Sequence, residues 1–135
     1  MPKNQTDQEA EKKEYKDYSS LRAWQVGHEI NLQLHAAMQE CRSDQEARSW
    51  ADSVLLSMRD SVVQIMEAFR KYPAAEKLKR YEASMYYANQ AHYTLILGEE
   101  LGFWSLSELI SKLIEYERIV KSTSFHFLDK KEKKV

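Results

Sequence analysis

The 135-residue chain is long enough for one domain with one core and too short for two ordinary domains. Hydrophobic residues make up 43% and charged residues 30%, with only three glycines and two prolines, which favours long helices over a turn-rich β fold. The formal net charge of −1 excludes attraction of the whole molecule to nucleic acid or anionic membranes, so any such binding requires a local patch.

The two ends of the chain are expected to be flexible tails. Residues 1–18 and 126–135 are dominated by polar and charged side chains, which cannot bury enough apolar surface to offset the entropy lost on ordering. The bundle is therefore predicted to occupy residues 19–125. The N-terminus lacks the features of a secretory signal, and no apolar run approaches the roughly eighteen residues of a membrane span. With a single cysteine, Cys41, these features predict a cytoplasmic protein that does not contact membranes.

The first helix is predicted to begin at a cap formed by Ser19 or Ser20 and to run to about Cys41. Its apolar residues recur at alternating steps of four and three, the spacing of a helix face that packs in a core. This first stripe consists of Ala23, Gly27, Ile30, Leu34, Ala37 and Cys41.

The same helix carries a second stripe on another face. At about 100° per residue, this stripe projects about 140° away from the first one. A helix in a monomeric bundle needs one buried face, so a second apolar face predicts contact between copies of the chain. Two alternatives remain open: one broad face enclosed within a single bundle, or an N-terminal tail folded over the stripe. The second stripe consists of Leu21, Trp24, His28, Leu32 and His35.

Asp44 can cap a second helix that reaches about Tyr72. Pro73 then ends it, because proline disfavours helix in the residue before it yet suits the first turn of the next helix. The packed face of the second helix consists of Ala51, Val54, Met58, Ser61, Ile65, Ala68 and Tyr72, widened by Leu55, Val62 and Phe69.

A third helix follows Pro73 and ends near Gly102, a residue that accepts the left-handed conformation common just past a helix end. Ser105 and Glu108 then form a capping-box pattern that opens a fourth helix. The packed faces of these two helices consist of Leu78, Tyr81, Met85, Ala88, His92 and Leu95, and of Leu106, Leu109, Leu113, Tyr116 and Val120 with Ile110 and Ile114 beside them. Four helices with short connections predict an all-α, antiparallel up-down-up-down four-helix bundle.

Three segments carry a resemblance to a known family: residues 21–30 (LRAWQVGHEI), 64–68 (QIMEA) and 98–103 (GEELGF). They resemble the opening signature, the core motif and the Leu-Gly-aromatic turn of a bacterial four-helix bundle family. That family is known from proteins encoded in intervening sequences of large-subunit (23S) ribosomal RNA genes. It also includes the accessory variability determinants of diversity-generating retroelements. The chain departs from the pattern at Ala68, where members usually carry glycine, and at Tyr86 and Tyr87, where they often carry a Gly-Ser pair.

The resemblance implies a homo-oligomer, commonly a ring of five subunits. In the retroelement branch it also implies a positively charged surface that binds reverse transcriptase and RNA. That branch is strongly basic, whereas this chain is not.

The sequence offers no pattern for a catalytic, metal or cofactor site. A carboxylate-bridged metal pair in a bundle needs Glu-x-x-His on two helices, and the sequence contains no such motif. His28 and His35 share a helix face, but seven residues separate them by about 10 Å, too far to ligate one ion together. His92 is expected to be a hydrogen-bonded core histidine. Enzymatic activity is therefore not expected.

Basic residues gather at the reversal between the second and third helices: Arg70, Lys71, Lys77, Lys79 and Arg80. The first two complement the dipole at a helix C-terminus, whereas the others stand where the dipole disfavours positive charge. The cluster is either a solvated helix end or a patch that binds an anionic partner, strengthened by repetition around a ring.

Two functional hypotheses follow. One is a homo-oligomeric adaptor that binds RNA, or a nucleic-acid enzyme such as a reverse transcriptase, through the basic cluster. The other is a structural or protein-binding module, supported by the near-neutral charge and by an aromatic content of 11%.

Overall fold

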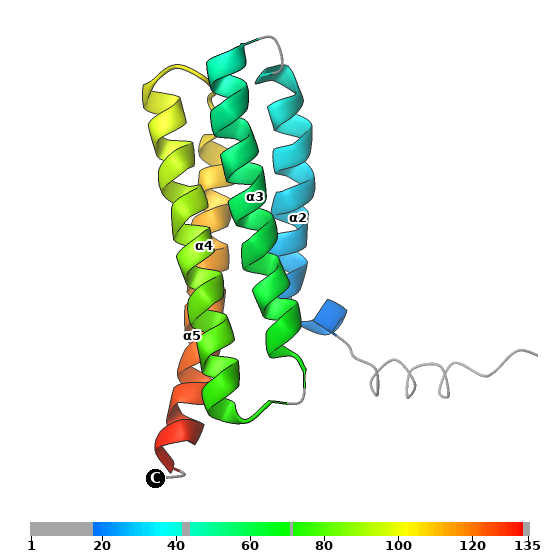
Figure 1. Cartoon of the computed structure of the whole chain (residues 1–135), viewed down its shortest axis with the longest axis vertical. Helices are drawn as coiled ribbons and strands as arrows, with labels where there is room; N and C mark the ends of the chain where they lie inside the picture. Colours follow the sequence, from blue (N-terminus) through cyan, green and yellow to red (C-terminus); the bar gives the residue numbers. More distant parts are fainter. Residues whose placement is uncertain (1–17, 42–43, 71, 134–135) are drawn as a thin grey trace, which may run out of the picture.

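The computed structural model describes residues 18–41, 44–70 and 72–133. Within these ranges the chain forms four α-helices and no strand: α2 (Arg22–Met38), α3 (Gln45–Ala68), α4 (Ala74–Glu100) and α5 (Ser107–Lys133). Two 3-10 turns, η1 (Tyr18–Ser20) and η2 (Gln39–Cys41), flank α2. Successive helices run in opposite directions (Figure 1). The all-α, up-down-up-down four-helix bundle predicted from the sequence is confirmed.

Each helix packs mainly against two neighbours. α2 contacts α3 and α5, and α4 contacts the same two helices. α2 and α4 therefore occupy opposite corners of the bundle. The face between α2 and α3 consequently lies across the molecule from the face between α4 and α5.

The core is built from the packed faces that the helical periodicity predicts. In α2 the first stripe is buried except at Ala37, which is half-buried, while Met38 is buried beside it. The largest fully buried side chains come from all four helices and include Ile30, Leu34, Met58, Ile65, Leu95, Leu113 and Tyr116. Burial of this kind is the main stabilising contribution to a bundle, at about 1.5 to 3 kcal/mol for each large apolar side chain.

Two of the predicted helix starts have different outcomes. At α3 the prediction is confirmed, because Asp44 Oδ1 accepts a hydrogen bond from the Ala47 amide over 3.1 Å. At α2 the predicted serine cap is wrong: the residue at the cap position is Leu21, in an extended conformation and without a side-chain cap. The two serines lie one turn earlier, in η1, where the Leu21 amide donates to the Tyr18 carbonyl over 3.0 Å.

The reversal between α3 and α4 begins earlier than the sequence predicts. α3 ends at Ala68 instead of continuing to about Tyr72. Pro73 disfavours helical backbone angles at Tyr72, so the helix does not reach that residue. In addition, the Lys77 ammonium donates to the Ala68 carbonyl over 2.9 Å and so satisfies one of the free carbonyl groups at the end of α3. Pro73 itself occupies the cap position of α4, so the predicted new start is confirmed.

The end of α4 confirms the role predicted for Gly102. This glycine has a φ of 83°, and its amide donates to the Glu99 carbonyl while the Phe103 amide donates to the Gly98 carbonyl. The pair of bonds is a Schellman motif, which requires a left-handed residue at this position.

The start of α5 differs from the predicted capping box. α5 begins at Ser107, so Ser105 lies before the cap position and Glu108 is already in the first turn. The Leu106 amide donates instead to Glu99 Oε1 over 2.7 Å. A carboxylate from the end of α4 therefore satisfies the start of α5.

The C-terminal segment predicted to be a tail from residue 126 continues α5 to Lys133. Phe127 is half-buried and stacks on the Tyr81 ring, with 5.4 Å between the ring centroids and 15° between the planes. This contact with α4 supplies the apolar burial that the local sequence lacks. Of the predicted N-terminal tail, residues 1–17 lie outside the described part of the chain.

Candidate functional site

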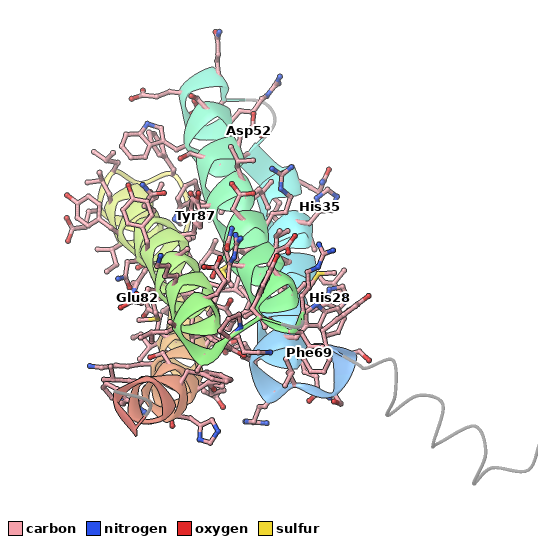
Figure 2. The ribbon with its side chains drawn as sticks, turned by 60° about the horizontal axis from the view of Figure 1, so that its bottom comes forward. His28, His35, Asp52, Phe69, Glu82 and Tyr87 are labelled. Atoms are coloured by element: carbon pink, nitrogen blue, oxygen red, sulfur yellow. The ribbon has the colours of Figure 1, made fainter. Side chains whose placement is uncertain are left out.

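The second stripe is divided: Leu21 and Trp24 pack against the edge of the core, as a broad face within one bundle would, while the rest of the stripe lies on the outside of α2. Leu21 and Trp24 are half-buried, while His28, Leu32 and His35 are exposed, with Leu32 at 60% exposure. Figure 2 shows His28 and His35 following one another along the outside of the bundle at α2.

Three rings, those of Tyr18, Trp24 and His28, pack together at the N-terminal end of this stripe. The Trp24 ring stacks on His28, with centroids 4.6 Å apart and 14° between the planes. The Tyr18 ring also contacts Trp24, with centroids 5.3 Å apart and the planes tilted by 57°. The Trp24 indole nitrogen is buried without a hydrogen-bond partner among the described residues. Stacked aromatic side chains of this kind offer a large contact area that is already ordered.

Residues of α3 join the second stripe to form a hollow of about 390 Å³ between the two helices. α2 contributes Trp24, His28 and His35 to it. Opposite them, α3 contributes a row of mostly apolar side chains at helical spacing: Leu55, Arg59, Val62, Val63 and Met66.

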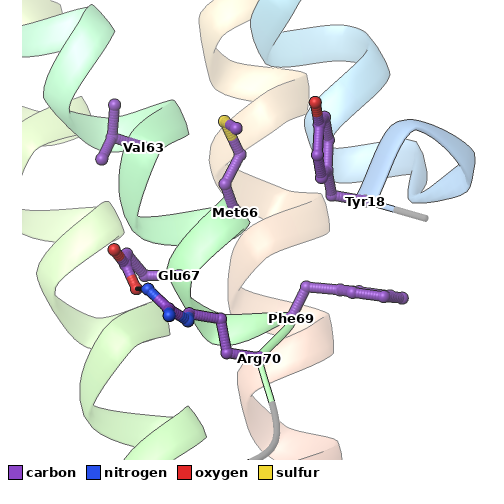
Figure 3. Close-up of a pocket in the computed structure, with 6 residues that line it drawn as sticks. All are labelled: Tyr18, Val63, Met66, Glu67, Phe69 and Arg70. Carbon is purple, nitrogen blue, oxygen red and sulfur yellow. Dashed lines mark hydrogen bonds and ion pairs between the residues drawn. The ribbon is translucent and has the colours of Figure 1, made fainter. Parts of the chain in front are cut away.

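A second hollow of about 360 Å³ continues the first toward the end of α3, with Val63 and Met66 lining both. Tyr18 of η1 and Phe69 line it on one side, and Glu67 and Arg70 line it on the other (Figure 3). Val63 is 41% exposed and Phe69 is 39% exposed. The two hollows together are called the α2/α3 groove from here on.

The main packing partner of α3 is α4, on the side away from the groove. Small residues at the contact let α3 and α4 pack closely, with Ser61 of α3 hydrogen-bonded to Ser84 of α4 across the buried interface. α3 makes more extensive contact with α4 than with α2. The side chains at the outer edge of the α2–α3 contact form the groove.

The α3 half of the groove was not predicted from the sequence. Leu55, Val62 and Phe69 were interpreted as a widening of the core face, and Val63 and Met66 were not singled out. The usable signal is the spacing of Leu55, Val62, Val63 and Met66, which forms a stripe offset from the buried face of α3.

The basic cluster at the α3–α4 reversal is largely engaged within the chain. Arg70 pairs with Glu67 over 3.4 Å, and Arg80 pairs with Glu76 over 3.2 Å. These exposed or half-exposed pairs are weak, at about 0 to 1 kcal/mol each, yet they neutralise charge locally.

Two further residues of the cluster have distinct positions. Lys77 donates to the terminal carbonyl of α3, which explains a positive charge in the first turn of α4 without an external anion. Lys79 is exposed. Lys71 lies outside the described residues. The structure thus brings the cluster together at one end of the bundle, with most of its described charges already held by internal partners.

The histidines do not converge on an ion site. Among the residues described, no three His, Cys, Asp or Glu side chains are grouped so as to hold a metal. His35 Nε2 lies 3.3 Å from the side-chain Nε2 of Gln39, and the His28 ring is stacked on Trp24. His92 is half-buried rather than fully in the core, and its Nδ1 lies 2.9 Å from Glu117 Oε1.

The His92–Glu117 pair joins α4 to α5 and gives the stability a pH dependence. Burial raises the pKa of Glu117 above its ordinary value of 4.5, and the neighbouring His92 offsets this only in part. The folded state therefore holds this proton to a higher pH than the unfolded chain does. The contribution to stability is complete below about pH 4.5 and is lost as pH rises through the raised pKa.

Replacing Glu117 with Gln should remove this pH dependence. We expect the free energy of unfolding of the original chain, minus that of Glu117→Gln, to fall as pH rises from 4 to 7. Urea unfolding at several pH values measures the difference. Glu115→Gln on the same helix is the control, because it removes a carboxylate whose ion pair, with Arg22, is exposed to solvent. A difference that rises with pH would contradict the assignment.

No α-helix in the described ranges combines the length and apolar character needed to cross a bilayer. Comparison of the chain with protein-family models, curated proteins and solved structures finds no match.

Proposed function

We propose that this protein is a self-associating helical-bundle adaptor, acting in the cytoplasm by binding rather than by catalysis, and that the α2/α3 groove is where copies meet. The observation that carries the proposal is a continuous apolar groove around Trp24 on the outside of a bundle whose core is already complete. Contiguous apolar patches of this kind are uncommon on monomers unless they serve an interface.

The energetics favour association. Full burial of a valine or phenylalanine side chain contributes about 1.5 to 3 kcal/mol, so covering the exposed parts of Val63 and Phe69 recovers part of that free energy at each contact. The near-zero net charge means that copies do not repel one another strongly.

A cover from within the same chain is less well supported. The segment before Tyr18 is rich in charged residues and has Tyr15 as its one aromatic. Such a segment has too little apolar surface to fill the groove. A second copy of the bundle is therefore the better-matched occupant.

Exchanging an apolar groove residue for an acid should prevent association. We expect Val63→Glu to weaken self-association roughly 100-fold or more, because burying an unpaired carboxylate costs about 3 kcal/mol or more. Its effect on the stability of the monomer should stay within about 0.5 kcal/mol, since Val63 is at the surface. The measurement is light scattering after size exclusion over a range of concentrations.

Phe125→Glu is the matched control, because Phe125 is an exposed apolar residue of α5 outside the groove. It should associate as the original chain does. Unchanged assembly of Val63→Glu would remove the groove from the proposal.

The number of copies and the partner follow from the family resemblance. It predicts a ring of five subunits that presents the cluster around Arg70 and Lys79 repeatedly to RNA or to a nucleic-acid enzyme. Retention of structured RNA should then be clear at low salt and fall steeply as salt increases. Absence of retention at low salt would favour the alternative, a protein-binding module without nucleic acid.

A further inference from the structure

The outward side of α4 carries the most exposed aromatic side chains described in this chain. Tyr86 is 60% exposed and Tyr93 is 64% exposed. They are seven residues apart, which places them on one side of the helix about 10 Å from each other. With Glu82 and Glu100 at its two ends, this surface is called the α4 ridge.

The ridge is ordered before it meets a partner. The Gln90 amide donates to the Tyr86 hydroxyl over 3.1 Å, and the Tyr87 ring packs edge-on against Tyr86, with centroids 5.5 Å apart. Side chains that are already held lose less entropy on binding, and exposed tyrosines are typical anchors of protein interfaces. Glu82 lies across the molecule from His28 and His35 (Figure 2).

The shapes of the two surfaces differ in a way that selects the partner. The α2/α3 groove is concave, so two grooves placed face to face would leave unfilled space between them. Interfaces that bind well are packed as densely as protein interiors, which requires a convex surface to fill a concave one. Tyr86 and Tyr93 project from the outside of α4 at 60% and 64% exposure, and the groove consists of two adjoining hollows that could each receive one ring.

The charges are complementary as well. Residues 82–100 of α4 contain no lysine or arginine and carry glutamates at both ends. The groove carries Arg59 and Arg70, and each is paired with a neighbouring carboxylate, Asp60 over 3.1 Å and Glu67 over 3.4 Å. Both arginine side chains are 66% exposed, whereas the two carboxylate side chains are 33% exposed. An acidic ridge that covers the groove would therefore meet mainly guanidinium surface, whereas two identical grooves would bring arginine against arginine.

Building on the proposed self-association, we propose that the contact is heterologous: Tyr86 and Tyr93 of one copy insert into the α2/α3 groove of the next. Each copy then has one groove and one ridge, and each uses both. Head-to-tail contacts of this type generate rings when the rotation closes and open filaments when it does not.

Mixing two complementary variants tests the contact. Val63→Glu disables the groove and leaves the ridge, whereas Tyr86→Glu/Tyr93→Glu disables the ridge and leaves the groove. Each variant alone should have the mass of a single chain by light scattering. An equimolar mixture should form a species of about twice that mass, because one intact ridge meets one intact groove and growth stops there.

The outcomes separate this inference from the proposed function. If Tyr86→Glu/Tyr93→Glu assembles like the original chain while Val63→Glu does not, self-association through the groove is supported. The α4 ridge is then not the surface that fills the groove. A mixture that stays at the mass of one chain also overturns the heterologous contact. Circular dichroism and urea unfolding of each variant confirm the fold, and serine replacements at the same positions repeat the test without added charge.

Discussion

Replacing Tyr116 with Ala should lower the free energy of unfolding by about 4 kcal/mol. Tyr116 is the largest fully buried side chain, and its hydroxyl lies 2.8 Å from Ser61 Oγ and 3.2 Å from Ser84 Oγ. Removing a core aromatic side chain typically costs about 3 to 5 kcal/mol, and two buried serine hydroxyls lose a partner as well.

Urea unfolding monitored by circular dichroism measures this loss. Phe125→Ala, an exposed aromatic change on the same helix, is the control and should cost less than about 0.5 kcal/mol. Tyr116→Phe isolates the hydroxyl and should cost about 1 to 2 kcal/mol. A loss below about 1 kcal/mol for Tyr116→Ala would show that the three-helix contact is not formed as described.

The buried hydroxyl network also resists alkali. Burial raises the pKa of Tyr116 to about 12, although its hydrogen bonds with Ser61 and Ser84 oppose this shift. The tyrosine therefore remains a neutral hydrogen-bonding group at the pH values used in the experiments above. The network joins α3, α4 and α5 at one level and favours a single register of the helices.

Replacing Gly98 with Ala should destabilise the fold by about 2 kcal/mol, although alanine ordinarily favours a helix over glycine by about 1 kcal/mol. A β-carbon at Gly98 would overlap the indole ring of Trp104. That ring is held by a hydrogen bond from its nitrogen to the Leu95 carbonyl over 2.9 Å. The ring must therefore move, and it loses both packing and its hydrogen bond.

Gly102→Ala provides the contrast for this prediction. A β-carbon there meets nothing within 4 Å, so its cost of about 1 kcal/mol comes only from the left-handed backbone. Unfolding experiments give the two losses, and near-ultraviolet circular dichroism should change strongly for Gly98→Ala alone. Equal spectra for the two variants would contradict the assigned contact with Trp104.

The fold could be predicted from the sequence because helical periodicity, helix caps and helix-breaking residues depend only on residues close together in the chain. Asp44, Pro73 and Gly102 act within a few residues of themselves, and their predicted roles are confirmed. Predictions failed where a distant group intervenes. Glu99 caps the start of α5, and stacking of Phe127 on Tyr81 extends α5 beyond its predicted end.

The candidate site could be predicted only in part for the same reason. The second stripe of α2 is visible in the spacing of Trp24, His28 and His35. The matching residues of α3 cannot be recognised from their spacing alone. Whether Val63 faces the core or a groove depends on the distance between α2 and α3. The pairing of the basic cluster, such as Lys77 with the end of α3, likewise depends on the three-dimensional turn.

The molar mass of the unmodified protein in solution tests the central claim most directly. Light scattering on a freshly purified sample should give a multiple of the 15.9 kDa chain mass, and the value should fall toward one chain only on extensive dilution. A mass of 15.9 kDa that stays constant up to high protein concentration would mean that Trp24 and its groove face solvent. Self-association through α2 and α3 would then be excluded.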